Sequence, residues 1–276
     1  MSHDDSHVAH GAAATALQRL VDRYGGELYN LAYRFCGTRE EAEDLVQEVF
    51  LNAFRSWGEF RGESDVKTWL YRIAARSCQR MHRKRAGEPQ RIASLDAALP
   101  FGDRFVGVLA SEQDDALQEQ IRTEARQQLE AAITQLPDEF RVPLILKEIV
   151  GFSVREVADI LGLEEGTVRS RVHRARLKLR EAVDRAIPRG SEPAPPVAYD
   201  QQTCMDLLHA KQEALDRGVP FRDDVICERC RSVFDGLDLT HSLCREIGGE
   251  SIPGDVRRRL MGLLDDGPRE ATPSGG

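Results

Sequence analysis

The chain contains no long apolar run and only six cysteines. No apolar run in its 276 residues approaches the roughly 18 residues that a membrane helix needs, so a transmembrane protein is excluded. Six cysteines are too few for a disulfide scaffold in a chain of this length. The first residues show no basic segment followed by an apolar one, so we expect no secretory signal and a cytoplasmic location.

The chain also lacks an excess of positive charge, since 38 Lys and Arg against 46 Asp and Glu give a formal net charge of −8. The total hides two stretches without any acidic residue. Lys67–Arg85 holds seven basic residues and Arg169–Arg180 holds six. A phosphate backbone meets the local field rather than the total charge. One basic run is typical of a solvated helix face, but two acid-free runs favour a nucleic-acid-binding protein.

Apolar residues recur every three or four positions through most of the chain, which predicts an all-α fold. The first bundle should contain residues 14–87, with a break near Gly25 and Gly26. Residues 88–119 lack a sustained period and should form a flexible linker, and residues 188–200 should form a Pro-rich one. We expect residues 1–13 and 267–276 to be disordered.

Residues 120–187 carry the pattern of a helix-turn-helix domain. Ser153 and Glu156 have the spacing of a capping box, Gly162 marks a tight turn, and a long basic helix follows from about residue 165 to 186. The second helix of such a motif enters the major groove by its N-terminal end. An ordinary three-helix bundle with a charged face is the alternative. If the apolar residues of the long helix face the core, four side chains are left for base edges, Arg169, Ser170, His173 and Arg174, while Arg171, Arg176, Lys178 and Arg180 suit phosphates.

Four motifs in this order resemble the extracytoplasmic-function (ECF) sigma factors of bacterial RNA polymerase. They are Glu41-Ala-Glu-Asp-Leu-Val-Gln-Glu-Val-Phe50, Phe60-Arg-Gly-Glu-Ser64, Thr68-Trp-Leu-Tyr-Arg-Ile-Ala74 and Gly166-Thr-Val-Arg-Ser-Arg-Val-His-Arg-Ala-Arg176. The resemblance covers about residues 14–187. It implies two small helical domains, sigma region 2 over 14–87 and sigma region 4 over 120–187. Together these would bind core RNA polymerase, recognise a promoter and melt it, without being an enzyme.

The resemblance also assigns roles to individual residues. Region 2 would bind polymerase through Asp44, Gln47 and Glu48. Region 4 would read the −35 element through Arg169, Ser170, Arg171, His173 and Arg174. Capture of an unstacked base in the −10 element suits planar side chains beside a cationic groove, and the candidates are Phe60, Arg61, Ser64, Lys67, Trp69, Arg72, Arg76 and Arg80. Arg76 stands where many members of the family carry asparagine.

Four of the six cysteines lie in the last quarter of the chain. Cys227 and Cys230 form a CxxC pair whose spacing lets two thiolates bind one tetrahedral metal ion, and Cys204 precedes them. Residues 201–266 resemble the zinc-binding anti-sigma domains, here fused to the sigma factor, which implies a Zn²⁺ ion held by Cys204, Cys227, Cys230 and Asp223. Asp223 stands where those domains carry histidine, so His209, His241 and Cys244 remain alternative fourth ligands. A redox-switchable or metal-sensing site and plain buried cysteines are the other interpretations.

The last apolar pattern, Val256 to Leu264, predicts an amphipathic helix. We expect it either to complete the core of the cysteine-containing domain or to dock on the sigma domains and modulate polymerase access. The acidic linker and C-terminal part would then lie near the basic surfaces until polymerase and promoter displace them. Two other classes of protein are alternatives. A helix-turn-helix repressor or activator would bind DNA without polymerase, and a metal-dependent enzyme would need a nucleophile arrangement or His-rich helix that the sequence does not contain.

Overall fold

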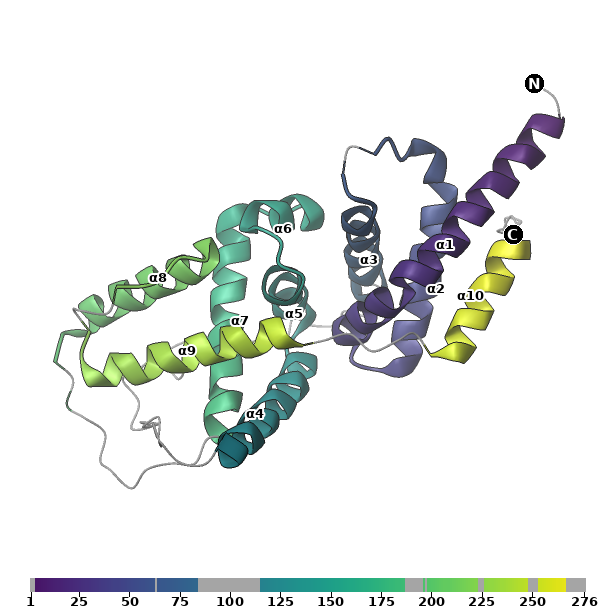
Figure 1. Ribbon diagram of the computed structural model, residues 1–276. Coiled ribbons are helices and arrows are strands. Elements are labelled where there is room, and N and C mark those ends of the chain that lie inside the picture. The colour runs from purple at the N-terminus through teal and green to yellow at the C-terminus, as the bar shows by residue number, and fades with distance from the viewer. Residues whose placement is uncertain are drawn as a thin grey trace. The chain divides into compact units, whose positions relative to one another are not determined.

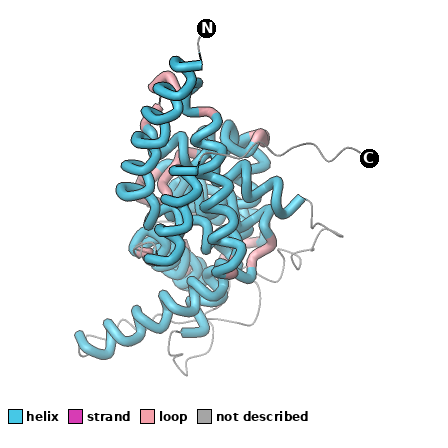
Figure 2. The backbone as a smooth tube through the Cα atoms, turned by 90° about the vertical axis from the view of Figure 1, so that its right-hand side faces the viewer, coloured by secondary structure: helices cyan, strands magenta, loops and turns pink. Residues whose placement is uncertain are grey.

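A computed structural model gives the fold of the chain (Figure 1). It describes residues 3–83 except 63, then 115–186, 196, 198–222, 226–247 and 253–266. The chain divides into two compact units. The first holds residues 1–87 and 249–276, and the second holds residues 88–248. Within the described residues every regular element is a helix and no strand occurs (Figure 2), which confirms the all-α prediction.

The first unit is built from three helices of the N-terminal part, α1 (His3–Cys36), α2 (Arg39–Arg55) and α3 (Val66–Arg83), joined by Gly37 and a 3₁₀ turn, Trp57–Glu59. Thr38 caps α2, because its hydroxyl accepts a hydrogen bond from the Glu41 backbone N–H at 3.3 Å. The core forms where the apolar stripes of the helices meet, as at Phe35, Phe50 and Leu70, each at most 1% exposed.

Helix α1 differs from the sequence prediction at two places. It begins at His3, inside the range 1–13 for which disorder was expected, and it runs without a break through Gly25 and Gly26. Several alanines precede residue 17, and alanine has the strongest intrinsic helix preference. Buried residues on both sides of the glycine pair, Val21 and Leu28, pack into the core, and this packing outweighs a glycine cost of about 1 kcal/mol each.

The second unit begins with α4 (Asp115–Gln135), α5 (Asp138–Leu144) and a π-helical turn (Ile145–Ile149). Gly151 follows this stretch with φ of 90°. Helices α6 (Val154–Leu161) and α7 (Glu165–Ala186) follow. Residues 84–114 and 187–195, which contain most of the two predicted linkers, lie outside the described residues.

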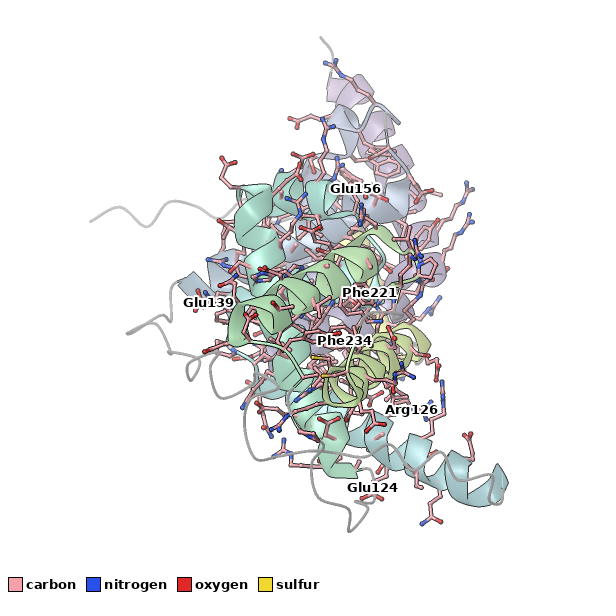
Figure 3. All side chains as sticks on the ribbon, turned by 90° about the vertical axis from the view of Figure 1, so that its left-hand side faces the viewer. Glu124, Arg126, Glu139, Glu156, Phe221 and Phe234 are labelled. Carbon is pink, nitrogen blue, oxygen red and sulfur yellow. The ribbon has the colours of Figure 1, made fainter. Side chains whose placement is uncertain are left out.

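Two further helices, α8 (Gln201–Arg217) and α9 (Glu228–Glu246), complete the second unit. Helix α9 crosses α7 in Figure 1. Leu177 of α7 belongs to one apolar cluster with Leu208 of α8 and Phe234 of α9. Figure 3 shows Phe234 beside Phe221 of the segment between α8 and α9, and their ring centroids lie 5.2 Å apart.

The last helix, α10 (Gly254–Asp266), belongs to the first unit. It packs against α1 and α2 through Val256 and Leu260, both at most 1% exposed. Among the described residues, no helix is long and apolar enough to cross a membrane.

Candidate nucleic-acid interface

The helix-turn-helix motif has the local features that its sequence predicts. The Ser153 hydroxyl accepts from the Glu156 backbone N–H, and the Glu156 carboxylate accepts from the Ser153 backbone N–H at 2.8 Å, which completes the capping box. Gly162 ends α6 in the left-handed region with φ of 65°. The predicted core positions of α7, Val168, Val172, Ala175, Leu179 and Val183, are all buried.

The predicted base-reading residues share the opposite face of α7. Arg169, Ser170 and Arg174 are exposed. Arg169 is paired with Glu165 one turn earlier at 2.8 Å. An exposed ion pair of this kind contributes little free energy, so Arg169 can leave it to bind DNA. Arg171 is half-buried and lies 3.6 Å from Glu139. The face therefore offers two guanidinium groups and a hydroxyl to a groove, and the chemistry suits guanine edges and phosphates.

His173, the fourth candidate, is already engaged. Its Nε2 lies 2.9 Å from a carboxylate oxygen of Asp216 on α8. The other oxygen of the same carboxylate accepts from Arg176 at 2.7 Å. The sequence did not predict that Asp216 contacts this helix, because Asp216 lies 40 residues beyond Arg176, in the stretch that resembles the anti-sigma domains.

The structure corrects the predicted role of Arg176, which the sequence analysis assigned to phosphate binding. It is 1% exposed and is the centre of a buried charge cluster. Its guanidinium donates to Glu148 at 2.6 Å and to Asp216 at 2.7 Å, and also to the side-chain oxygen of Gln212 at 3.0 Å. The second oxygen of Glu148 is bound by Nδ1 of His241 on α9. Arg176 and Glu148 thus link four elements, α7, the π-helical turn, α8 and α9.

The carboxylates of this cluster are held in their ionised form. Burial raises the pKa of Glu148, but Arg176 and His241 outweigh it, so the pKa lies below its usual value. The same balance holds for Asp216, where His173 and Arg176 outweigh burial and the pKa is again lowered. The guanidinium pKa is raised, since the two carboxylates outweigh burial. The cluster is therefore a set of mutually stabilised charges.

Arg180 is likewise unavailable to a phosphate in this arrangement. It pairs with Asp184 at 3.3 Å, and its side chain is 11% exposed. Helix α9 approaches it at Gly236, where an added Cβ would lie 3.1 Å from both Arg180 Cγ and an Asp184 carboxylate oxygen. Glycine is needed there because the two helices touch.

A groove of about 300 Å³ runs between α7 and α8. Ser170, His173 and Arg174 line it from α7. Met205, Leu208, His209 and Gln212 line it from α8. The residues proposed to read DNA therefore form one wall of a groove whose other wall belongs to the same chain.

The −10 candidates gather at the start of α3. Phe60 and Trp69 lie with ring centroids 4.9 Å apart, and Trp57, which the sequence analysis did not assign to DNA, stacks on Phe60 at 5.8 Å. All three are half-buried. Successive bases stack on such planar groups. Trp57 was missed because its spacing also fits the apolar face of α2.

Basic side chains extend from this aromatic group along α3. Arg61 and Arg76 are exposed, whereas Ser64 and Arg72 are half-buried. Lys67 pairs with Glu27 at 2.5 Å. Arg80, on the exposed surface, donates to Ser77 at 2.9 Å and to Glu48 at 3.2 Å. The candidates thus share one helix and its preceding loop.

The proposed polymerase-binding residues lie on α2. Asp44 is exposed, and Gln47 and Glu48 are half-buried. Glu43, one position before Asp44, is bound by Arg259 of α10 and by Arg39 at 2.8 Å. Two further ion pairs join α10 to this unit, Arg257 with Asp22 and Asp255 with Arg39.

The cysteines separate into two places. Cys204 on α8 and Cys230 on α9 are buried with their sulfur atoms 3.9 Å apart, and Cys227 caps α9 beside them. Cys244 and His241 lie beside Glu148 instead, and His209 lines the groove. Asp223 lies outside the described residues. Within the part of the chain that the structure describes, no three Cys, His, Asp or Glu side chains are arranged to hold a metal ion.

The thiols differ in acidity. Burial raises the pKa of Cys230 to about 12, and the neighbouring thiols add to the effect. Burial also raises the pKa of Cys204. For Cys227, backbone N–H groups of Cys230 and Ala198 outweigh burial, so its pKa is lowered. Cys227 is therefore the most readily ionised of the three.

The fold and these surfaces define a two-part helical DNA-binding protein of the sigma-70 type. Residues 20–88 match the family model of Sigma-70 region 2, and residues 126–179 match that of Sigma-70, region 4. The RNA polymerase sigma-H factor of Pseudomonas aeruginosa is 35% identical over 174 residues, which cover 62% of this chain and 86% of that protein. The ECF sigma factor SigW of Bacillus subtilis is 32% identical over 169 residues, which cover 60% and 88%. The chain belongs to the ECF RNA polymerase sigma factors.

Two solved structures are similar in part. One is the sigma factor RpoE in complex with the anti-sigma factor NepR from Bartonella quintana, at 23% identity and a TM-score of 0.38, covering 65% of this chain and 96% of that one. The other is CnrH in complex with the cytosolic domain of CnrY, at 24% identity and a TM-score of 0.40, covering 64% and 96%. As a member of its family, the chain is a transcription initiation factor and not an enzyme, and it acts with core RNA polymerase on promoter DNA.

Proposed function

We propose that this sigma factor reads the −35 element with the N-terminal half of α7. The observation that carries the proposal is the exposed row of Arg169, Ser170 and Arg174 on a capped helix-turn-helix. A bidentate arginine contact to guanine discriminates by about 1–3 kcal/mol. Replacing Arg174 by alanine should therefore weaken transcription from one promoter class by about 5- to 150-fold. Equal loss on all promoters would restrict Arg174 to phosphate binding.

The aromatic group at the start of α3 is proposed to hold the unstacked strand of the −10 element. Stacking of one base on an aromatic side chain contributes about 1–3 kcal/mol. With core polymerase bound, Phe60→Ala should slow promoter opening, measured by the fluorescence of 2-aminopurine in the −10 element. Tyr33→Ala is the control, because Tyr33 is an exposed aromatic side chain on α1, and it should leave opening unchanged. Equal opening by the two variants would remove the base-stacking role.

Helix α2 is proposed to dock on core polymerase through Asp44, Gln47 and Glu48, as its family resemblance implies. Asp44 is the exposed member and the first to test. Asp44→Lys should lower the affinity for purified core polymerase, whereas Glu124→Lys on α4 (Figure 3) should not. Because core polymerase and promoter DNA are in the bacterial cytoplasm, we propose that the protein works there too.

The C-terminal segment is proposed to regulate these activities through its cysteines and through contacts with the sigma regions. Support comes from the shared core with α7, from the ion pairs of α10 with α1 and α2, and from the proximity of three thiols on α8 and α9. Thiolates suit Zn²⁺, and Cys204, Cys227 and Cys230 would hold it with Asp223 as the fourth ligand. Thiolates and a carboxylate are all ligand types that zinc accepts. Cys204 lies on α8, whereas Cys227 and Cys230 lie at the start of α9, so a bound metal ion would fix the two helices to each other.

Metal analysis tests this site directly. The full chain, purified under reducing conditions with zinc supplied, should carry one zinc ion per chain. In vitro transcription with the full chain and with residues 197–276 deleted, each with and without metal, should differ if the segment regulates. Equal activity under all four conditions would reject regulation, and a metal-free chain would reject zinc.

A further inference from the structure

The face of α7 that is proposed to read DNA, with Ser170, His173 and Arg174, lies beside helix α8 of the same chain. Besides the apolar cluster around Leu177, α8 places the Asp216 carboxylate on two neighbouring side chains of α7, His173 and Arg176. The contact is nearly dry, since the Asp216 side chain is 6% exposed and the Arg176 side chain 2%. The two helices are therefore joined at the middle of the surface proposed to meet DNA.

The Asp216 carboxylate lies where a phosphate group of DNA would bind His173 and Arg176. A carboxylate bound by an arginine and a histidine of a DNA-reading helix satisfies the same donors that a backbone phosphate engages. Gln212, one turn earlier on α8, adds two contacts, accepting from Arg176 at 3.0 Å and donating to the His173 backbone carbonyl at 3.2 Å. Helix α8 thus presents one charge and one amide to a surface built for polar recognition.

The space left between the helices excludes a duplex. The groove of about 300 Å³ between Ser170, His173 and Arg174 on one side and Met205, Leu208 and His209 on the other is the size of a small-molecule site. A reading helix enters a major groove about 12 Å wide, with the duplex enclosing it on both sides. Helix α8 stands where one of those sides must pass.

We propose that residues 201–247 compete with promoter DNA for α7, with Asp216 in the place of a backbone phosphate. The proposal rests on the proposed reading role of α7. Docked α8 and bound DNA exclude each other, so promoter binding requires α8 to leave. The Glu148–Arg176 pair remains on region 4 when α8 leaves, while the Arg176 donors used by Asp216 and Gln212 become free for DNA.

The size of the effect follows from the hydrogen bonds that hold α8. A hydrogen bond to a charged group contributes about 1.5–3 kcal/mol, so removing the Asp216 charge should favour the open form by about 10- to 150-fold. If the docked form dominates in the free protein, the affinity for DNA should rise by up to that factor.

The experiment uses the full-length protein and a short fluorescein-labelled duplex of random sequence, whose binding is followed by anisotropy at low salt. Asp216→Lys is the test variant, because it repels Arg176, and Asp216→Asn is the milder one. Asp206→Asn is the matched control, since Asp206 is exposed on α8 and accepts a hydrogen bond from Gln202 of the same helix at 2.9 Å. Hydrogen exchange of α8 measures docking independently, and unchanged exchange in α5 and α6 shows that region 4 is folded.

The expected result is faster exchange in α8 and at least tenfold tighter DNA binding for Asp216→Lys, with neither change for Asp206→Asn. Added DNA should also speed the exchange of α8 in the unmodified chain. Faster exchange without tighter binding, or DNA binding without any change in α8, overturns the competition. An Arg174→Ala substitution that leaves DNA affinity unchanged in the Asp216→Lys protein would instead refute the reading role of α7, and hydrogen exchange would still show whether α8 docks.

Discussion

Arg176→Met should be among the most destabilising single substitutions in the second unit. The change removes a guanidinium that is 1% exposed and that donates to Glu148, Asp216 and Gln212. Methionine fills much of the volume, so the loss is chiefly electrostatic. Removing one partner of a buried ion pair costs about 3–5 kcal/mol, because the remaining charge is left without compensation. His241 still binds Glu148 and His173 still binds Asp216, which places the expectation at the lower end, about 3 kcal/mol.

Urea denaturation followed by circular dichroism measures this loss through the midpoint of the transition of the second unit. Lys178→Met is the matched control on the same helix, since the Lys178 side chain is half-exposed and pairs with Glu181 one turn away at 2.8 Å. An exposed pair of this kind contributes about 0–1 kcal/mol. The double substitution Arg176→Met with Glu148→Gln should recover part of the loss, because one buried carboxylate is then neutral. A loss below about 1 kcal/mol for Arg176→Met would refute the central role of this cluster.

Three other predictions follow from the same contacts. The pKa values of Glu148 and Asp216 are lowered in the folded protein. Their ionised forms therefore stabilise the fold above the usual carboxyl pKa of about 4, and this stabilisation is lost as the pH falls through the lower folded values. The free energy of unfolding, measured as a function of pH, should show this loss, and Arg176→Met should make the loss smaller. Gly236→Val should weaken the docking of α9 on α7 by about 1–3 kcal/mol, because its Cβ meets Arg180 and Asp184, and hydrogen exchange in α9 measures it against Gly262→Val, where the added Cβ has open space. Cys230→Ala should abolish zinc binding and Cys244→Ala should retain it, because Cys244 lies beside Glu148; zinc loss in both, measured by metal analysis, would contradict the proposed ligand set.

Much of the second unit could be predicted from local sequence signals. The capping box, the turn glycine and the three-to-four spacing of apolar residues gave the bounds of α7 and its buried face correctly, because each depends on neighbours a few residues away. The predicted break at Gly25 and Gly26 was wrong, because α1 is continuous there. There, tertiary packing of Val21 and Leu28 outweighs the local preference, and no local signal reports packing.

The charge cluster could not be predicted because its members lie far apart in the chain. Arg176 resembled its neighbours in a basic run, and only the arrival of Asp216, Gln212 and His241 from later helices distinguishes it. Glu148 carried one usable signal, since it stands with Lys147 among the apolar residues Ile145, Leu146 and Ile149. A charged residue in such a setting is buried only with a partner, but the sequence does not say which partner.

The covalent connection between α7 and α8 has a consequence for dosage. A separate inhibitor leaves its target when both are diluted, whereas a segment on the same chain meets α7 at an effective concentration that does not change with dilution. The fraction of docked molecules should then be the same whether a cell holds few copies or many. Raising the expression of this sigma factor would raise the amounts of α7 and of the docked segment together, so this inhibition should not be overcome at a threshold of expression, as inhibition by a separate protein would be.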